Sequence, residues 1–561
     1  MRKLFLLGVV FLSGPLFGAV QWEDLSPQER LGQTLVVFVD VDSAEMVRPV
    51  IEEGKIGGVL VQWGNYSLAE TQKLIEKLQG WAAKSPHKIP LLISIDYEGG
   101  TVYTPITLGF DYLPTNMMLS ASRDEEGAAA IAYLAGQELR RTGVHINFSP
   151  VLDVNSNPNN PIIGVRSFGS DAGNVTKMGI SLMNGFKAAG IISIVKHFPG
   201  HGDTSDDSHY AVPVVKADKA QLKKIHLKPF QEAVRQKVDG IMTGHVMYPA
   251  LDEKNIATFS KPILQDLLRG EMGFNGLIVT DSLDMKGATS YCTIAGCAVR
   301  SLAAGTDMVL LGRYIKPAST YNQIWQQVQA ENLQPRVDEA AKRVFRLKER
   351  LGLLETPAVL PEPSEKAYQA ELAKLSDEAV TLVRNRKQLL PFKPVKKAAE
   401  KPTVCAVFFA PSRFADQLMS FSQPFLEHGW IVRSYNAALT PKKKDSQRAA
   451  QCAKGADLLI LTSLQWADKT NINQKNAISG LIKENKNVVF ISTMSPYDIV
   501  QYPEADTVLA TYGLNKYVLQ TSARIILGDL KARGKMPVIL PASADGAKPK
   551  IHTPPAKQKS R

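Results

Sequence analysis

The sequence predicts an α/β protein in which a (β/α)8 barrel of the TIM type is followed by a smaller α/β sandwich domain. Eight short apolar runs in the first part of the chain are rich in Val, Ile and Leu and do not alternate cleanly, as expected for strands buried on both faces. Helix-like segments lie between many of these runs. A stretch containing Pro and Glu then precedes a second set of five strand-like runs.

The eight predicted barrel strands span residues 35–40, 56–62, 89–96, 144–154, 191–197, 238–246, 274–282 and 307–312. Clear helical segments are expected at 124–142, 175–189, 217–235, 261–272 and 337–351. Parallel strands require a crossover connection, usually a helix, so this alternation favours a parallel barrel. We assign residues 20–355 to it.

The second domain is predicted over residues 368–541, after a linker at 356–367 that contains the letters TPAVLPEPS. Its strand-like runs span 404–409, 430–435, 457–463, 487–493 and 507–511, with helical segments between them. Five such runs are typical of a doubly wound sheet with helices on both faces.

The N-terminus has the plan of a signal peptide, which we place at residues 1–19. Arg2 and Lys3 precede the apolar run 4–12, and Gly14-Pro15 interrupts any helix there. The apolar run is too short for a stable membrane span. We therefore expect an exported protein of the periplasm or the extracellular space. Export permits disulfide bonds, but the sequence does not predict how the four cysteines pair.

The net charge of +12 lies mainly outside the predicted folded body. Residues 1–19 contribute +2, residues 384–401 contribute +6 and the tail 542–561 contributes +4, so the remainder is close to neutral. This distribution argues against a nucleic-acid groove. The basic tail is predicted to be disordered, and its charge suits a solvated surface or a loose attraction to anionic envelope polymers.

Ionisable residues fall at the carboxyl ends of five predicted barrel strands: Asp96, Asp153, Lys196 with His197, His245, and Asp281. That end of a barrel carries the active site in enzymes of this fold. Helix capping would account for a single aspartate. Five occurrences among eight strands indicate a shared site.

The densest group of such residues is the segment KHFPGHGDTSDDSH at 196–209, which its Pro and Gly residues mark as a loop. One interpretation is a metal-dependent hydrolase with the ligands His197, His201, Asp203 and His209. The other is an acid/base loop in which Asp207 orients His209 and raises its pKa. The absence of a helical His-Glu-x-x-His motif and the neighbouring cation Lys196 argue against the metal.

This segment resembles the signature of glycoside hydrolase family 3, in the branch of bacterial β-N-acetylglucosaminidases (NagZ-like). Residues 94–100, 148–169, 241–251 and 277–287 are similar to further segments of the family, in the same order, and 379–392 resembles the start of its second domain. Thr101 stands where the family usually has Arg.

The resemblance implies a retaining exo-β-N-acetylglucosaminidase that releases terminal N-acetylglucosamine from peptidoglycan fragments through a covalent glycosyl-enzyme intermediate. It implies that Asp281 is the nucleophile and that His209, paired with Asp207, is the acid/base. Asp96, Arg166, Lys196 and His197 correspond to residues that hold the terminal sugar, and Asp153 and His245 to residues that line the same site. No metal or other cofactor is implied, and the second domain is expected to supply no catalytic residue.

Several alternatives stay open at this point. A histidine acid removes a negative charge beside the second nucleophile, which would favour phosphate and make the enzyme a β-N-acetylglucosaminide phosphorylase. Another β-glycosidase activity is a further alternative. The metal-dependent hydrolase and a noncatalytic envelope-binding protein are alternatives from other classes.

Overall fold

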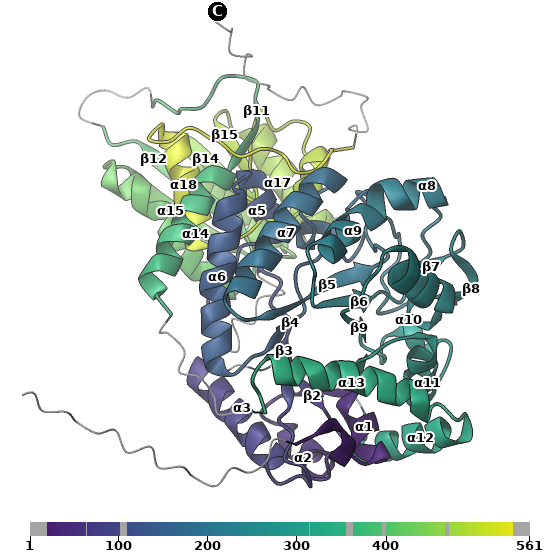
Figure 1. Ribbon diagram of the computed structural model, residues 1–561. Helices are drawn as coiled ribbons and strands as arrows, with labels where there is room; N and C mark the ends of the chain where they lie inside the picture. Colours follow the sequence, from purple (N-terminus) through teal and green to yellow (C-terminus); the bar gives the residue numbers. More distant parts are fainter. Residues whose placement is uncertain are drawn as a thin grey trace, which may run out of the picture.

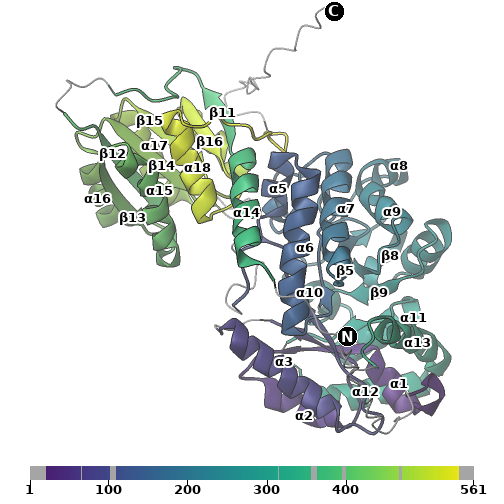
Figure 2. The same ribbon diagram turned by 60° about the vertical axis from the view of Figure 1, so that its left-hand side comes forward.

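A parallel eight-stranded barrel and a separate six-stranded sheet make up the protein in the computed structural model (Figures 1 and 2). The structure describes residues 20–541 except 63, 65, 101–108, 314, 355–362, 395–399 and 466–470. The predicted signal peptide, the basic tail and most of the predicted linker lie outside the described residues. Within them, no helix is long and apolar enough to cross a membrane.

The barrel strands follow the order β10-β1-β2-β3-β4-β5-β6-β9, and every pairing between neighbours is parallel. A bridge between Val279 and Met308 joins the two ends of this order, so the barrel nearly closes. The strands are β1 (Leu35–Val39), β2 (Gly58–Val61), β3 (Leu92–Ile95), β4 (Ile146–Asn147), β5 (Ile192–Phe198), β6 (Gly240–Thr243), β9 (Leu277–Thr280) and β10 (Val309–Leu310). The predicted barrel is confirmed.

Helices surround the barrel strands on the outside (Figure 1). They are α1 (Pro27–Gln33), α2 (Ala44–Glu52), α3 (Leu68–Ala82), α5 (Asn116–Ser122), α6 (Glu125–Thr142), α7 (Ala172–Ala188), α9 (Leu227–Arg235), α10 (Lys286–Thr289), α11 (Ile294–Ala304), α12 (Pro317–Ala330) and α13 (Gln334–Arg350). Local signals set their ends. In α6, the Asp124 carboxylate accepts a hydrogen bond from the Gly127 N–H, and Gly143 ends the helix at a positive φ of 94°.

Three predicted elements differ from the structure. The predicted strand 144–154 is regular only in β4, because Pro150 has no N–H to continue the ladder. The predicted helix 217–235 consists of the short α8 (Lys219–Gln221), a π-helix η4 (Leu222–His226) and α9. The predicted helix 261–272 is a π-helix, η6 (Pro262–Glu271).

A small hairpin of β7 (Met247–Tyr248) and β8 (Asp252–Ile256) follows β6.

The second sheet has the order β11-β16-β15-β14-β12-β13. Its strands are β11 (Thr381–Asn385), β12 (Thr403–Phe409), β13 (Ile431–Ala437), β14 (Leu458–Ser463), β15 (Val488–Ser492) and β16 (Thr507–Ala510). The five predicted strands are present and parallel, and β11 adds an antiparallel edge strand that was not predicted. Its helices are α14 (Glu365–Ala379), α15 (Ala415–Glu427), α16 (Lys443–Ala453), α17 (Ile472–Glu484) and α18 (Lys516–Leu527).

The two domains share an apolar interface. Helix α14, which begins inside the predicted linker 356–367, runs along α5 and α6 and also packs on α18 (Figure 2). Met117 and Met118 of α5 are fully buried in the core of the second domain. The Thr115 hydroxyl donates a 2.7 Å hydrogen bond to the carbonyl of Tyr512. The second sheet is therefore held directly against the barrel beside α5.

The four cysteines form two disulfide bonds, Cys292–Cys297 and Cys405–Cys452. The first joins the segment before α11 to the first turn of that helix. The second joins β12 to α16 across the second domain.

Candidate active site

A buried ionic cluster centred on Glu98 lies at the carboxyl ends of β3 and β5. Lys196 Nζ lies 2.6 Å from Asp96 Oδ1 and 2.6 Å from Glu98 Oε1. The Arg166 guanidinium donates two hydrogen bonds to the same glutamate, at 2.7 Å from Nε and 2.9 Å from Nη2. The Gln62 amide donates to the second oxygen of Asp96 at 2.8 Å. Five residues are thus linked through the carboxylates of Glu98 and Asp96, and Lys196 bridges the two.

The two carboxyl groups of this cluster differ in the direction of their pKa shifts. Although burial favours a neutral carboxyl, Arg166 and Lys196 lower the pKa of Glu98 to about 2. Burial raises the pKa of Asp96 above its usual value, in spite of the cation Lys196 beside it. Glu98 is therefore a permanent anion that holds two cations in place, whereas the side chain of Asp96 is more exposed than that of Glu98.

His197 and Asp153 form a second buried pair next to the cluster. His197 Nδ1 lies 2.6 Å from Asp153 Oδ2, and Nε2 lies 3.4 Å from the Arg166 guanidinium. The other oxygen of Asp153 accepts from the backbone N–H of His201 at 2.6 Å. Asp153 is fully buried, so it orients the His197 ring from behind and at the same time fixes the start of the following loop.

Asp281 follows directly after β9, at the same end of the barrel. The backbone N–H of Ser282 donates to Asp281 Oδ1 at 2.7 Å. Although burial opposes ionisation, the neighbouring His197, His245 and Lys196 lower the pKa of Asp281 below its usual value. Asp281 is thus an ionised carboxylate on a rigid strand end.

His245 holds the backbone immediately after Asp281 in place. Its Nε2 lies 2.9 Å from the carbonyl of Ser282 and its Nδ1 lies 2.8 Å from the Thr258 hydroxyl. Both ring nitrogens of this fully buried histidine are therefore used, and burial lowers its pKa. In this structure His245 holds the backbone beside Asp281.

His209 and Asp207 lie on the loop that follows β5. Asp207 Oδ1 accepts from His209 Nδ1 at 2.7 Å and from the His209 backbone N–H at 2.9 Å. This hydrogen bond raises the pKa of His209 above its usual value in spite of partial burial, and the charge of Asp281 acts in the same direction. The backbone N–H of Gly287 donates to the Ser208 carbonyl at 2.9 Å, which ties the loop to the segment after Asp281.

The structure thus brings the nine predicted site residues to one end of the barrel. Two residues of the ionic cluster, Glu98 and Gln62, were not predicted. Glu98 does stand in the segment 94–100 that carried the family resemblance, and a glutamate two residues after a strand-end aspartate was the available signal. The residues of the metal interpretation have other partners: Asp203 accepts from Ser156, and His201 contacts Thr204 and Ser208. The described residues contain no group of three or more potential ligands with metal-binding geometry.

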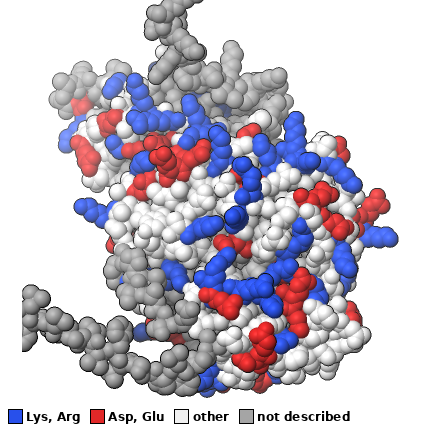
Figure 3. All heavy atoms as spheres, in the orientation of Figure 1, with Lys and Arg blue, Asp and Glu red and all other residues white. Residues whose placement is uncertain are grey.

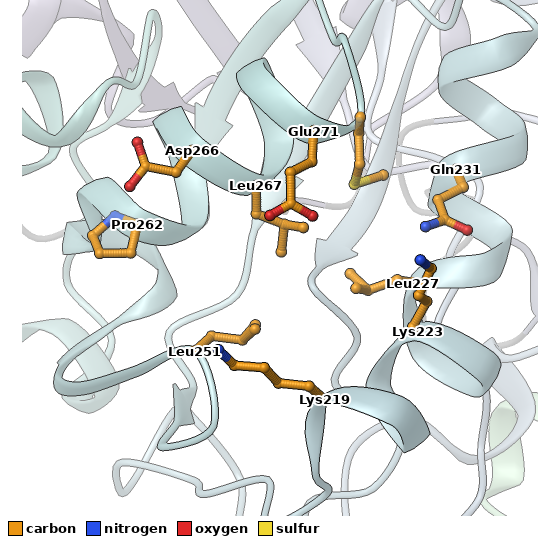
Figure 4. Close-up of a pocket in the computed structure, with 10 residues that line it drawn as sticks. Lys219, Lys223, Leu227, Gln231, Leu251, Pro262, Asp266, Leu267 and Glu271 are labelled. Atoms are coloured by element: carbon orange, nitrogen blue, oxygen red, sulfur yellow. The ribbon is translucent and has the colours of Figure 1, made fainter.

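One pocket of the described surface lies away from this site. A pocket on the outside of the barrel, between η4 and α9 on one side and η6 on the other, contains none of the predicted site residues (Figure 4).

On the face seen in Figure 3, basic and acidic side chains are interspersed over the described surface. The positive net charge is therefore not gathered into one patch on this face.

Comparisons with known proteins place both domains of the chain in one enzyme family. The Glycosyl hydrolase family 3 N terminal domain matches residues 27–347, and the Glycosyl hydrolase family 3 C-terminal domain matches residues 333–560. Beta-hexosaminidase A of Pseudoalteromonas piscicida is 30% identical, over 87% of this chain and 90% of its own length. A Cellulomonas fimi protein described as beta-N-acetylglucosaminidase/beta-glucosidase is 26% identical, over 92% of this chain and 94% of its own.

A solved structure gives the same result. A family 3 beta-N-acetylglucosaminidase from Paenibacillus sp. str. FPU-7 superposes with a TM-score of 0.82 at 29% identity, over 92% of this chain and 99% of that one. Both domains are therefore shared with this neighbour. The chain belongs to glycoside hydrolase family 3 and is a glycoside hydrolase.

Proposed function

We propose that the protein is a retaining exo-β-N-acetylglucosaminidase that removes terminal N-acetylglucosamine from peptidoglycan fragments. The observation that carries this proposal is the pairing of two different groups at one barrel end: the ionised carboxylate of Asp281 and the imidazole of His209, hydrogen-bonded to Asp207. A retaining glycosidase needs a nucleophile and a separate proton donor. The full-length relatives named above act as further support, since their names specify hexosaminidase or N-acetylglucosaminidase activity.

In the first step, Asp281 attacks the anomeric carbon while His209 gives a proton to the leaving oxygen. Because Nδ1 of His209 donates to Asp207, the proton is exchanged at Nε2. The glycosidic C–O bond breaks and an ester bond to Asp281 forms. In the second step, neutral His209 takes a proton from water, whose oxygen attacks the same carbon and releases Asp281, with net retention of configuration.

The ionic cluster supplies the site for the terminal sugar. Asp96 accepts from the sugar hydroxyls and the adjacent Lys196 ammonium donates to them, while Arg166, whose guanidinium lies 3.4 Å from His197 Nε2, completes the site with His197. These donors are fixed by buried partners before the substrate arrives, so little conformational entropy is lost on binding. Fixed donors and acceptors for the hydroxyls of a single sugar ring suit an enzyme that removes the terminal sugar of a chain.

Several features support an exported enzyme of cell-wall turnover. The N-terminus has a signal-peptide plan, and the two disulfide bonds are typical of proteins of oxidising compartments. The basic tail 542–561 would be attracted loosely to anionic envelope polymers. Fractionation of cells that produce the full chain tests the location: we expect processed protein outside the cytoplasm, and unprocessed cytoplasmic protein would contradict the proposal.

A phosphorylase is the second candidate. The neutral imidazole of His209 would repel an incoming phosphate dianion less than a carboxylate would. This difference favours phosphorolysis as the alternative reaction. A panel of chromogenic β-glycosides tests both candidates. We expect turnover of the N-acetylglucosaminide and little turnover of the glucoside or xyloside, with or without phosphate. A rate that depends on phosphate, with glycosyl phosphate as product, would assign a phosphorylase, and preference for another sugar would overturn the proposed specificity.

A further inference from the structure

One hydrogen bond connects the second domain to the loop system that carries the catalytic residues. Tyr497 lies in the short helix η8 (Pro496–Gln501), which follows β15 of the second sheet. Its hydroxyl oxygen accepts a 2.9 Å hydrogen bond from the side-chain amide of Asn155 in the barrel. Asn155 is buried and stands two residues after Asp153.

The second domain holds Tyr497 firmly. The neighbouring Asp498 is fully buried and accepts hydrogen bonds from Ser492 at the end of β15, at 2.7 Å, and from Ser463 at the end of β14. The backbone N–H of Ser495 donates to the carbonyl of Gln465. The Tyr497 hydroxyl is therefore a fixed point on the carboxyl edge of the second sheet.

On the barrel side, Asn155 organises the loop that ends at Arg166. Its amide oxygen accepts from the backbone N–H of Gly164 at 3.2 Å. Gly164 begins the turn η3 (Gly164–Arg166), whose last residue makes the bidentate contact with Glu98. A shift of Asn155 is therefore transmitted to the guanidinium in the sugar site.

The same loop also supports the first half of the segment that carries His209. The Asn157 amide donates to the Thr204 carbonyl at 3.1 Å, and the Asn160 amide donates to the His201 carbonyl at 2.9 Å. The backbones approach closely here: a Cβ on Gly202 would lie 1.8 Å from the Val154 carbonyl oxygen. His201 in turn contacts the hydroxyl of Ser208, next to His209.

We propose that Tyr497 is a positioning residue through which the second domain aligns the loop that carries the acid/base His209. This inference rests on the proposed function, because it takes His209 as the proton donor. It assigns the second domain a part in catalysis, although we expect no group of that domain to touch the reacting atoms.

The experiment compares Tyr497→Phe with the wild-type full chain on two substrates. Chitobiose has a poor leaving group and needs a well-placed proton donor, whereas a 2,4-dinitrophenyl N-acetylglucosaminide leaves with little protonation. We expect kcat/KM, which reports the first step, to fall about 3- to 10-fold for chitobiose, as for the loss of one hydrogen bond, with a much smaller change for the aryl glycoside. Tyr435→Phe is the matched control, because its hydroxyl donates to Asp445 within the second domain.

A double-mutant cycle with Asn155→Ala separates positioning from general destabilisation. If Tyr497 acts through Asn155, the double variant is no slower on chitobiose than Asn155→Ala alone. Equal losses on both substrates, additive losses, or no loss in folded Tyr497→Phe would overturn the inference. Failure of the proposed function is distinguishable from these results, because the wild-type protein would then turn over neither N-acetylglucosaminide.

Discussion

The ionic cluster around Glu98 and the loop that carries His209 belong to one active site but are built in opposite ways. In the cluster, the side chains of Arg166, Lys196 and Glu98 are 7%, 4% and 1% exposed, and each has at least two polar partners. The His209 side chain is 48% exposed and its ring is hydrogen-bonded to Asp207. Sugar binding needs fixed charges, whereas proton transfer needs a group that reaches the leaving oxygen and titrates near neutral pH. The predictions below test this division.

The largest effect is expected for the nucleophile at the rigid end of the site. Asp281→Asn removes the attacking carboxylate but retains its shape and the contact with Ser282. We expect kcat to fall by about 10⁴-fold or more, as for removal of other catalytic nucleophiles. Steady-state assay with an aryl N-acetylglucosaminide measures this. Near-normal turnover by the variant would assign the nucleophile to another residue.

Breaking the buried cluster should cost stability as well as activity. Glu98→Gln leaves Arg166 and Lys196 as buried cations without their shared anion, so we expect the free energy of unfolding to fall by about 3–5 kcal/mol. Glu53→Gln, which removes an exposed carboxylate paired with Lys55, is the matched control and should cost less than about 1 kcal/mol. Urea unfolding of both variants measures the difference, and equal effects would contradict the account.

The low pKa of Glu98 predicts that the folded protein loses stability at acid pH. The pKa of Glu98 is about 2 in the folded protein against an ordinary value of 4.5. Its contribution to stability is therefore present above pH 4.5 and is lost as the pH falls from there toward 2. Between these limits, the wild-type protein should lose stability more steeply than Glu98→Gln. Parallel curves for the two proteins would show that Glu98 is not the group that titrates.

A smaller effect is expected on the half-exposed loop. Asp207→Asn weakens a charge-assisted hydrogen bond to His209, and we expect about a tenfold loss of kcat/KM at neutral pH. Asp207 raises the pKa of His209, and the acid form of the ring is active below that pKa. The alkaline limb of the pH–rate profile should therefore move to lower pH in the variant. An unchanged limb would separate His209 from proton transfer.

The fold was predictable from the sequence because buried parallel strands appear as continuous apolar runs, and all eight barrel strands and five strands of the second sheet were found in this way. β11 was missed because its residues are only half buried and its direction depends on pairing with β16, far along the chain. Within the site, Glu98 was missed because its partner Arg166 lies 68 residues away, and only the closed barrel brings the two together.

The connection between Tyr497 and Asn155 was not predictable for the same reason. The two residues are 342 positions apart and belong to different domains. Asn155 stands in the segment 148–169 that carried the family resemblance, but nothing in that segment indicates a partner in the second domain. Residues at strand ends can be inferred from a repeating pattern, whereas contacts between domains depend on the surface that the folded barrel presents.

The most direct test of the central claim is the reaction of His209→Ala with a 2,4-dinitrophenyl N-acetylglucosaminide in the presence of azide. If Asp281 is the nucleophile and His209 the acid/base, the leaving group departs without help, and the glycosyl-enzyme then accumulates for lack of a base. Azide needs no general base, so it should restore turnover and yield the β-glycosyl azide. An α-configured azide would contradict retention, and the absence of rescue in a folded variant would contradict the assignment of His209.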